Sequence, residues 1–358
     1  MRKLPFIIAG LFLLGLWLPA LQMHFVVYKE FDDTENRELA PVPSLNNHAS
    51  RFTDQIDAYV ADHFGFRPDL IRWNSILRVY LLRSSPVKSV ILGKDSWLFY
   101  CSEALADGNS MNDYMGMIPL ADTELEKLRI RLEENRRRFS ERGIPYVVAI
   151  APNKNSMYGE YLPERIETCK SNETRLNQFI EYMGKKSDLR VLDLREALSS
   201  AKARRLPVYW ETDSHWNTYG AYVGYREIMG EIARIYPGAG PLGISGEVTV
   251  ERTTRGGDLA QMLFLTDLLA ESNHTRFELA SAPDQARLKK LLFRHDSFGD
   301  NLYPFLRKHF NEIVNIAPFA PFRFEEIFRD PPEVVLHLFT ERYLTQAVHD
   351  DFFYEEGK

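Results

Sequence analysis

The chain has 358 residues, 45% of them apolar, and a net charge of −6. This length and apolar content support one large domain or two smaller ones, each with its own core. The acidic balance excludes the basic surface of a nucleic-acid-binding protein, so we expect no nucleic-acid partner. The sequence has no H-E-x-x-H, paired C-x-x-C or P-loop motif, and we therefore predict neither a metal site nor a bound cofactor.

Residues 1–28 predict a membrane anchor. Arg2 and Lys3 precede an uncharged stretch from Leu4 to Gln22. About 20 apolar residues in a helix span the roughly 30 Å hydrocarbon layer of a bilayer. Basic residues before the span favour a cytoplasmic N-terminus and export of the remainder. A cleaved signal peptide and a buried core helix are the alternatives, but LWLPALQ is a poor match to a cleavage site, so we favour an uncleaved anchor.

Residues 29–50 are polar, contain two prolines and lack an apolar period, which predicts an extended tether. Residues 51–358 are then predicted to form the functional domain. The only two cysteines, Cys101 and Cys169, would be able to form one disulfide in an oxidising compartment. The sequence leaves open whether they meet.

The first part of this domain has clear local signals. Residues 54–83 have the spacing of amphipathic helices, and VILGKDSWLFY (90–100) predicts a β-hairpin. From about residue 121, helices and strands alternate. Thr123 and Glu126 predict a capping box at the start of a helix that Gly143 ends. The apolar PYVVAIAP that follows predicts a strand buried on both faces.

The alternation continues to the C-terminus. Helices are predicted over 174–183, after 194, over 217–235 and over 299–310, and strands over 189–194, 207–211, 287–294, 312–317 and 332–339. This order is typical of a doubly wound α/β domain with a mainly parallel sheet and helices on both faces. The segment 238–283 is predicted to be irregular and to carry substrate-facing loops. Its GAGPLG follows a helix and contains proline, so we do not assign it to nucleotide binding.

Two polar segments follow predicted strands, where open α/β sheets bind their ligands. ETDSHWNTYG (211–220) contains Asp213 and His215, and HDSFGDN (295–301) contains Ser297 at the start of a predicted helix. A serine needs a base to become a nucleophile. His215 is the candidate base and Asp213 its partner, because D-x-H spacing in an extended segment places both side chains on one side. The alternative is that both segments only cap helices.

Other residues near these segments are secondary candidates. The backbone N–H groups around Ser297 and Phe298 are predicted to stabilise an oxyanion. Asp258 is predicted to orient a loop, and an ion pair of Glu341 and Arg342 to support the end of the sheet. Among rival histidines, His63, His295 and His309, we treat His309 as structural, because a cation is favourable late in a helix.

Five residues are candidates for contact with substrate. Asn153 and Lys154 follow a predicted strand and are expected to reach the cleft. Lys154 would meet an acidic sugar or an oxyanion, or else bond loop carbonyls. Tyr158 and Trp216 are candidates for stacking on sugar rings, with a core position as the alternative for Trp216. His295 would narrow the oxyanion site, contact the acceptor or replace another basic group.

Eight segments resemble, in the same order, the alginate O-acetyltransferase AlgJ/AlgX group of SGNH-hydrolase-like proteins, including the related DHHW-type proteins. They are TENRELAPVPSL, DHFGFRPDLI, VILGKDSWLFY, IAPNKNSMYGEYLP, ETDSHWNTYGAYVGY, RGGDLAQML, FRHDSFGDNLYPFLRKHF and PEVVLHLFTERYL. In that family the D-x-H pair precedes the nucleophilic serine, as Asp213 and His215 precede Ser297 here. The sequence departs from the wider SGNH pattern at His295, where Gly or Arg is frequent.

The resemblance implies an SGNH-hydrolase-like (flavodoxin-like) fold and an O-acetyltransferase that acts on hydroxyls of an exopolysaccharide through a Ser-His-Asp acyl-enzyme. It also implies a membrane-bound O-acyltransferase that relays the acetyl group. With the anchor, it implies a single-pass inner-membrane protein whose catalytic domain lies in the periplasm or at the cell exterior. Two alternatives stay open. One is an acetyl esterase with the same triad, and the other is a non-catalytic subunit of a polysaccharide secretion or modification complex.

Overall fold

The computed structural model describes residues 3–25, 31–32, 37–44, 51–102, 108–281, 287–318, 320–344 and 346. The chain divides into two compact units. Unit 1 comprises Met1–Val87 and Ala260–Thr266, and unit 2 comprises Lys88–Leu259 and Asp267–Lys358. Residues 51–87, which we expected to begin the functional domain, thus group with unit 1. Parts of the predicted anchor and tether, at residues 1–2, 26–30, 33–36 and 45–50, lie outside the described residues.

Unit 1 contains the apolar N-terminal helix α1 (Leu4–Phe25). Its 22 residues include an 18-residue window with a mean hydropathy of 2.2, so length and composition make it a candidate membrane span. Within the predicted tether, the two-residue strands β1 (Phe31–Asp32) and β2 (Arg37–Glu38) pair antiparallel. The amphipathic segment after it forms α2 (Phe52–His63), α3 (Arg67–Ile76) and η2 (Leu77–Leu81).

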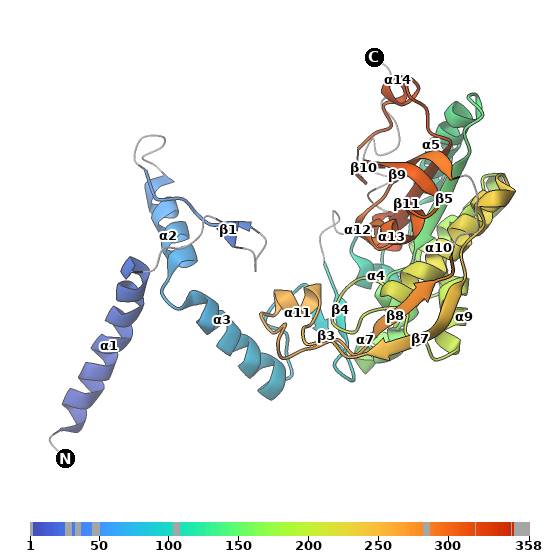
Figure 1. Cartoon of the computed structure of the whole chain (residues 1–358). Helices are drawn as coiled ribbons and strands as arrows, with labels where there is room; N and C mark the ends of the chain where they lie inside the picture. Colours follow the sequence, from blue (N-terminus) through green and yellow to red (C-terminus); the bar gives the residue numbers. More distant parts are fainter. Residues whose placement is uncertain are drawn as a thin grey trace. The chain divides into compact units, whose positions relative to one another are not determined.

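Unit 2 is built on a five-stranded parallel sheet with the order β10-β9-β11-β5-β6 (Figure 1). Its strands are β5 (Tyr146–Ala151), β6 (Val191–Asp193), β9 (Leu288–Arg294), β10 (Phe310–Ile316) and β11 (Val334–Thr340). All five lie where the sequence predicts strands. The apolar runs of the central strands β5 and β11 are buried along their whole length, whereas the edge strand β10 is partly exposed. The predicted fold class is confirmed.

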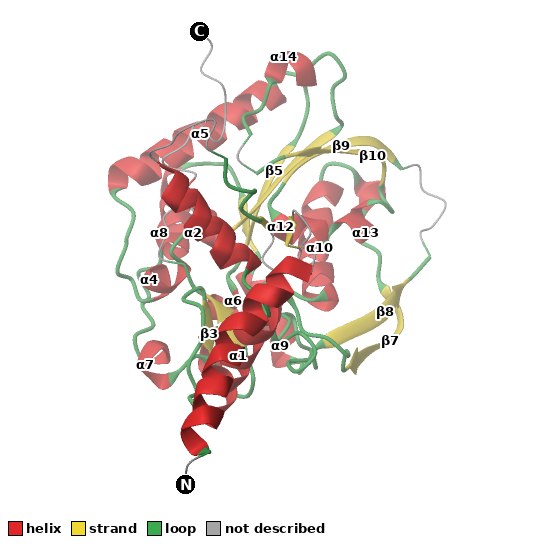
Figure 2. Ribbon diagram, turned by 90° about the vertical axis from the view of Figure 1, so that its left-hand side faces the viewer, coloured by secondary structure: helices red, strands yellow, loops and turns green. Residues whose placement is uncertain are grey.

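Strand β5 shows how both faces of the sheet are covered. Val147 and Ala149 belong to one apolar core, and Val148 and Ile150 to the other, since successive side chains of a strand point to opposite faces. The first core includes α9 (Arg195–Ala203) and α10 (Thr218–Ala233), and the second includes α5 (Asp122–Ser140) and α8 (Arg175–Lys186). Figure 2 shows α5 and α10 on opposite sides of the sheet.

Unit 2 has further elements outside this sheet. The predicted hairpin forms β3 (Val90–Leu92) and β4 (Leu98–Tyr100), which pair antiparallel. The remaining elements are α4 (Ser110–Tyr114), α6 (Lys154–Met157), η4 (Gly159–Tyr161), α7 (Glu164–Glu167), η5 (Pro237–Ala239), β7 (Ile244–Glu251), β8 (His274–Leu279), α12 (Ser297–Asp300), α13 (Tyr303–Leu306), α14 (Phe324–Ile327) and η6 (Glu341–Tyr343). The residues of α11 (Asp258–Met262) are divided between the two units.

Several local predictions are wrong. Residues 207–211 form no strand of the sheet, and the segment 238–283 is not irregular throughout, because β7 and β8 pair antiparallel within it. The helix predicted over 299–310 is two short helices, α12 and α13.

Helix α5 begins two residues earlier than predicted, with Ala121 rather than Thr123 as the N-cap residue. The Glu124 carboxylate accepts from the Ala121 N–H at 2.8 Å, so the capping contact does not involve Thr123 and Glu126. After the helix, Gly143 has a φ of +68°, the left-handed conformation that ends helices, as predicted. No disulfide joins Cys101 and Cys169 in this structure.

Candidate active site

Ser297 lies at a turn that the sheet holds in place. Strand β9 leads through two residues into α12, which begins at Ser297. Asp296 Oδ1 accepts from the Phe298 N–H at 2.9 Å, and Asp296 Oδ2 accepts from the N–H and the hydroxyl of Thr340 at 2.7 Å each. Because Thr340 ends β11, the neighbour of β9, this carboxylate ties the turn to the adjacent strand.

The same contacts change one prediction about the turn. The Phe298 N–H, expected to help hold an oxyanion, already donates to Asp296. The Ser297 N–H has no acceptor among the described residues, so it stays a candidate donor. The Ser297 side chain is exposed, as a nucleophile must be.

Asp213, His215 and Ser297 form one chain of hydrogen bonds. Asp213 Oδ1 lies 2.7 Å from His215 Nδ1, and His215 Nε2 lies 2.8 Å from Ser297 Oγ. An ionised carboxylate only accepts hydrogen bonds, so Nδ1 must carry the imidazole proton. Nε2 is then the acceptor for the serine hydroxyl, which is the arrangement that activates an alcohol.

The D-x-H pair reaches this position without a sheet strand. An isolated antiparallel bridge joins Tyr209 to Trp216, and residues 211–215 form bends between them. Asp213 Oδ1 also accepts from the His215 N–H at 2.9 Å. A turn closed by the aspartate on its own backbone, rather than the alternation of an extended strand, therefore brings the two side chains together.

Lys154 supports this loop from beneath and does not reach the cleft as a ligand. Its Nζ is buried and donates to the carbonyls of Leu98, Glu211 and Asp213 at 2.6, 2.7 and 3.0 Å. It also lies 4.9 Å from the centroid of the Trp97 ring. Burial lowers the pKa of Lys154 to about 8. The structure therefore agrees with the second alternative from the sequence, in which Lys154 donates to loop carbonyls.

Glu271 holds the other side of the loop, and the sequence analysis missed it. Its carboxylate accepts from the N–H groups of Glu211 and Thr212 at 2.7 and 2.8 Å, and from the Thr212 hydroxyl. Burial raises the pKa of Glu271. Glu271 lies 60 residues after Glu211, in a segment without a motif, so the sequence gave no signal for this role.

Asp258 and Gly257 clamp the loop at the aspartate of the triad. The Asp258 N–H donates to Asp213 Oδ2 at 2.9 Å. The Asp258 carboxylate accepts from the N–H and the hydroxyl of Ser214 at 2.7 and 2.5 Å, and lies 3.5 Å from His215 Nδ1. A Cβ at Gly257 would lie 2.3 Å from Asp213 Cβ, so only glycine allows this approach. The loop-orienting position predicted for Asp258 is thus observed.

The charges of this cluster act on each other. Burial alone would lower the pKa of His215, but the hydrogen bond and charge of Asp213 and the charge of Asp258 outweigh it, so the pKa is raised. Burial would raise the pKa of Asp213, yet the bond and charge of His215 lower it overall. Burial and then the charge of Asp213 raise the pKa of Asp258. These directions suit the roles predicted for His215 as a base and for Asp213 as its ionised partner.

Two predicted sugar-stacking residues are core residues. Tyr158 is buried, accepts from the Val208 N–H at 3.0 Å and stacks on Trp97 with ring centroids 4.4 Å apart. Trp216 is fully buried, and its Nε1 donates to the Phe298 carbonyl at 3.1 Å. Neither ring has a free face for a ligand. Trp216 instead links the D-x-H loop to the nucleophile turn.

His295 and Asn153 are both buried beside the site. His295 Nδ1 lies 2.7 Å from the Asp296 carbonyl, its ring stacks on Phe293, and it lines a cavity together with Ser297. Asn153 donates its N–H to Glu341 at 2.8 Å, while its side-chain amide has no partner among the described residues. Contact of either residue with substrate stays a prediction.

The residues after β11 differ from expectation. Glu341 accepts from the Asn153 N–H and the Ser156 hydroxyl, and Arg342 lies over aromatic rings, so the predicted ion pair between them is wrong. His309 is structural but not as a cation. Its Nε2 lies 2.6 Å from the Tyr225 hydroxyl, and burial lowers the pKa of His309 to about 4.

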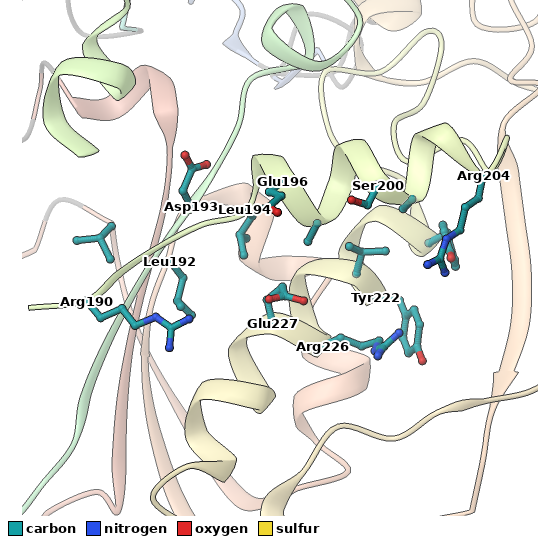
Figure 3. Close-up of a pocket in the computed structure, with 15 residues that line it drawn as sticks. Arg190, Leu192, Asp193, Leu194, Glu196, Ser200, Arg204, Tyr222, Arg226 and Glu227 are labelled. Atoms are coloured by element: carbon teal, nitrogen blue, oxygen red, sulfur yellow. The ribbon is translucent and has the colours of Figure 1, made fainter. Parts of the chain in front are cut away.

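A cavity of 390 Å³ opens at Ser297. It is lined by His295, Asp296, Ser297, Asp300, Asn315, Ile316, Ala317, Pro318 and Tyr343. A second cavity of 460 Å³ lies between β6, α9 and α10 (Figure 3), and it is lined by charged side chains such as Arg204, Arg226 and Glu227. None of the three hydrogen-bonded residues lines the second cavity, so the chemistry points to the one at Ser297.

Residues 90–298, more than half of the chain, match the model of a family described as the SGNH hydrolase-like domain of the acetyltransferase AlgX. The chain belongs to this family. The predicted AlgJ/AlgX resemblance and the predicted enzyme class, an O-acetyltransferase of the SGNH-hydrolase type, are thereby confirmed. The matched range ends one residue after Ser297 and includes Asp213 and His215.

Individual proteins of this family are similar over most of the chain. A probable alginate O-acetylase AlgJ of Azotobacter vinelandii is 27% identical over 303 residues, which cover 75% of this chain and 73% of that protein. The probable alginate O-acetylase AlgJ of Pseudomonas aeruginosa is 24% identical over 294 residues, with 72% and 71% covered. The structure of Bacillus cereus PatB1 matches with a TM-score of 0.51 at 16% identity, over 74% of this chain and 99% of that one, which shows a shared fold.

Proposed function

We propose that the chain is a membrane-anchored acetyltransferase that modifies hydroxyls of an exopolysaccharide through an acetyl-serine on Ser297. The hydrogen-bonded chain Asp213–His215–Ser297 is the observation that carries the proposal. Family membership supplies the reaction class, and the two AlgJ relatives, whose name states alginate O-acetylation, support a polysaccharide acceptor. Alginate belongs to those relatives, and we propose only the polymer class for this chain.

The reaction takes two steps of the same kind. In the first, Ser297 Oγ bonds to the acetyl carbon of the donor while its proton passes to His215 Nε2, and the carbonyl electron pair moves onto oxygen. The donor's leaving group departs with the proton that His215 returns. In the second, His215 takes a proton from a sugar hydroxyl, whose oxygen bonds to the acetyl carbon. The bond between that carbon and Ser297 Oγ then breaks, and His215 returns the proton to Oγ. Asp213 stabilises the imidazolium in both steps.

Helix α1 supports a location for this chemistry. As a candidate membrane span that follows basic residues, it would leave unit 2 on the periplasmic or outer side of the inner membrane. Acetyl-CoA is not expected there, so the donor is an acetyl ester or thioester presented by a membrane-bound O-acyltransferase. The anchor would keep unit 2 near that partner.

Two other functions are compatible with the same observations. An acetyl esterase would have the same triad and pass the acetyl group to water. A non-catalytic subunit of a secretion or modification complex would keep the fold without needing the Ser297 hydroxyl. The exposed hydroxyl bonded to an oriented imidazole favours catalysis over the second of these.

The test uses the full chain with 4-nitrophenyl acetate, with and without an oligosaccharide acceptor. We expect acetyl-oligosaccharide by mass spectrometry, and its loss together with ester turnover in Ser297→Ala. Ser140→Ala is the matched control, because Ser140 is an exposed helix residue whose hydroxyl bonds only a local carbonyl. Transfer to water alone would support the esterase, and full activity of Ser297→Ala would reject the acyl-enzyme.

A further inference from the structure

Arg342 is a nearly buried cation whose hydrogen-bond donors are unused. It follows β11 in η6, and only 8% of it is exposed. The guanidinium carbon lies 5.5, 5.2 and 5.6 Å from the ring centroids of Phe298, Tyr343 and Tyr100. Among the described residues no oxygen accepts a hydrogen bond from this guanidinium, and no carboxylate lies within ion-pair distance of it.

Such an arrangement leaves hydrogen-bond donors available to a ligand. None of the Arg342 nitrogens is among the fully enclosed side-chain atoms that lack a partner, so the five N–H groups of this guanidinium are open to an acceptor from outside the protein. The three rings attract the charge, but they do not accept these N–H groups as oxygens do. A planar fork of unused donors is suited to an anionic oxygen.

Arg342 lies beside the nucleophile turn. Thr340 lies two residues before Arg342 in the chain. It donates two hydrogen bonds to Asp296, the residue before Ser297. Phe298, under the guanidinium, directly follows Ser297, and Tyr343 lines the cavity that opens at Ser297. The pKa of His215 depends on burial, on Asp213, on Asp258 and also on Arg342. The positive charge of Arg342 lowers this pKa.

We propose that Arg342 binds an anionic oxygen at the reacting centre. This deepens the proposed function and rests on it. Two sources have this chemistry. One is the oxyanion that forms when Ser297 Oγ bonds to the acetyl carbon, its proton moves to His215, and the carbonyl electron pair shifts to oxygen. The other is a carboxylate of an acidic sugar next to the hydroxyl that receives the acetyl group.

The experiment compares wild type, Arg342→Lys and Arg342→Met in the full chain. Arg342→Lys keeps the charge and loses the planar fork. The control is Arg307→Met, because Arg307 also lies over a ring, that of Tyr303 at 5.1 Å, but is exposed. Thermal unfolding identifies variants that fail to fold. If Arg342→Met does not fold, the test uses Arg342→Lys with and without added guanidinium ion.

Three reactions separate the two sources. They are hydrolysis of 4-nitrophenyl acetate, transfer to a neutral hexose oligomer, and transfer to a hexuronic acid oligomer of the same length. If Arg342 holds the oxyanion, kcat falls by about 10²–10³ in all three reactions. If it holds a sugar carboxylate, KM rises at least about tenfold for the uronate oligomer alone.

The proposal is overturned if folded Arg342 variants keep wild-type kcat and KM in all three reactions while Ser297→Ala is inactive. Activity retained in Ser297→Ala would instead reject the proposed acyl-enzyme, whatever the Arg342 variants do. Recovery of an Arg342→Lys variant by added guanidinium supports a direct role of the fork. An equal loss in Arg307→Met would assign the effect to ring stacking and reject the proposal.

Discussion

The turn that carries Ser297 and the loop that carries Asp213 and His215 are built in different ways. The turn continues strand β9 and is bonded through Asp296 to the end of β11. The loop has no strand in the sheet and is held by buried side chains from other segments. These are Lys154, Asp258 and Glu271. The comparison teaches that the sheet, together with one carboxylate on the turn itself, positions Ser297, whereas charged side chains from other segments position Asp213 and His215.

The clearest way to break this comparison is at the loop's own carboxylate. Asp213→Asn replaces the acceptor of His215 Nδ1–H with an amide that favours the wrong tautomer, so we expect kcat to fall by about 10⁴-fold. Asp188→Asn, at an exposed position after α8, is the control and should leave kcat unchanged. Turnover of 4-nitrophenyl acetate measures both. A loss below tenfold in Asp213→Asn would mean that the pair does not act on Ser297.

The support beneath the loop gives the next largest effect. Lys154→Met leaves one buried and two partly buried carbonyls without their donor, at up to about 1–3 kcal/mol each. We expect a lower free energy of unfolding and, because the loop moves, a loss in kcat on the order of 10–100-fold. Chemical denaturation and ester turnover are the measurements.

Lys202→Met is the matched control for Lys154. Lys202 Nζ also donates to a carbonyl, that of Met157 at 2.6 Å, and lies 4.2 Å from the Tyr158 ring centroid. It has no bond to the D-x-H loop, so its loss should lower stability without lowering kcat. Equal effects of the two substitutions on kcat would show that the loop does not depend on its own lysine.

Asp258, the second carboxylate beside His215, allows a test through the pH dependence of activity. The base must be neutral to accept the serine proton, so activity falls as pH drops through the pKa of His215, which lies above 6.5. Asp213 and Asp258 face the imidazole as negative charges and Arg342 acts as a positive one. Asp258→Asn removes one negative charge, so we expect the pKa of His215 to fall and the acid limb of kcat/KM to move to lower pH.

A purely structural Asp258 would lower kcat and leave this limb in place. The control is Asp300→Asn, because Asp300 follows Ser297 in α12 but its side chain is 73% exposed, so water screens its charge. The acid limb of Asp300→Asn should stay near that of wild type. An unmoved limb in Asp258→Asn contradicts the expectation.

The same contrast explains what the sequence was able to predict. The parallel sheet and Ser297 follow from apolar strands and from the residues just after them, which are local signals. Asp213 and His215 were identified by spacing, although their predicted strand is absent. Glu271 was missed because its contact joins residues about 60 positions apart. Tyr158 and Trp216 were candidates for sugar stacking, with a core position as the alternative for Trp216, because ring type alone does not distinguish a core from a sugar site.

A smaller effect tests the sheet side of the comparison. Glu341 Oε2, just after β11, accepts from the Asn153 N–H and the Ser156 hydroxyl at 2.8 and 2.7 Å, which joins the ends of β11 and β5. Burial raises the pKa of Glu341 to about 7 from 4.5. Between these values the folded chain binds a proton that the unfolded chain has released. The free energy of unfolding therefore falls as pH rises from about 4.5 to 7, by about 1–3 kcal/mol.

Glu341→Gln keeps the shape and the accepting oxygen but cannot ionise, so this part of the pH dependence should disappear. Denaturation of wild type and variant at several pH values measures the difference, and Glu247→Gln, at an exposed position in β7, is the control. Because the sheet holds the end of β11 by backbone bonds, we expect kcat of Glu341→Gln to stay within a few-fold of wild type. A loss in kcat as large as that of Lys154→Met would show that the nucleophile side also depends on a buried charge, and the comparison would fail.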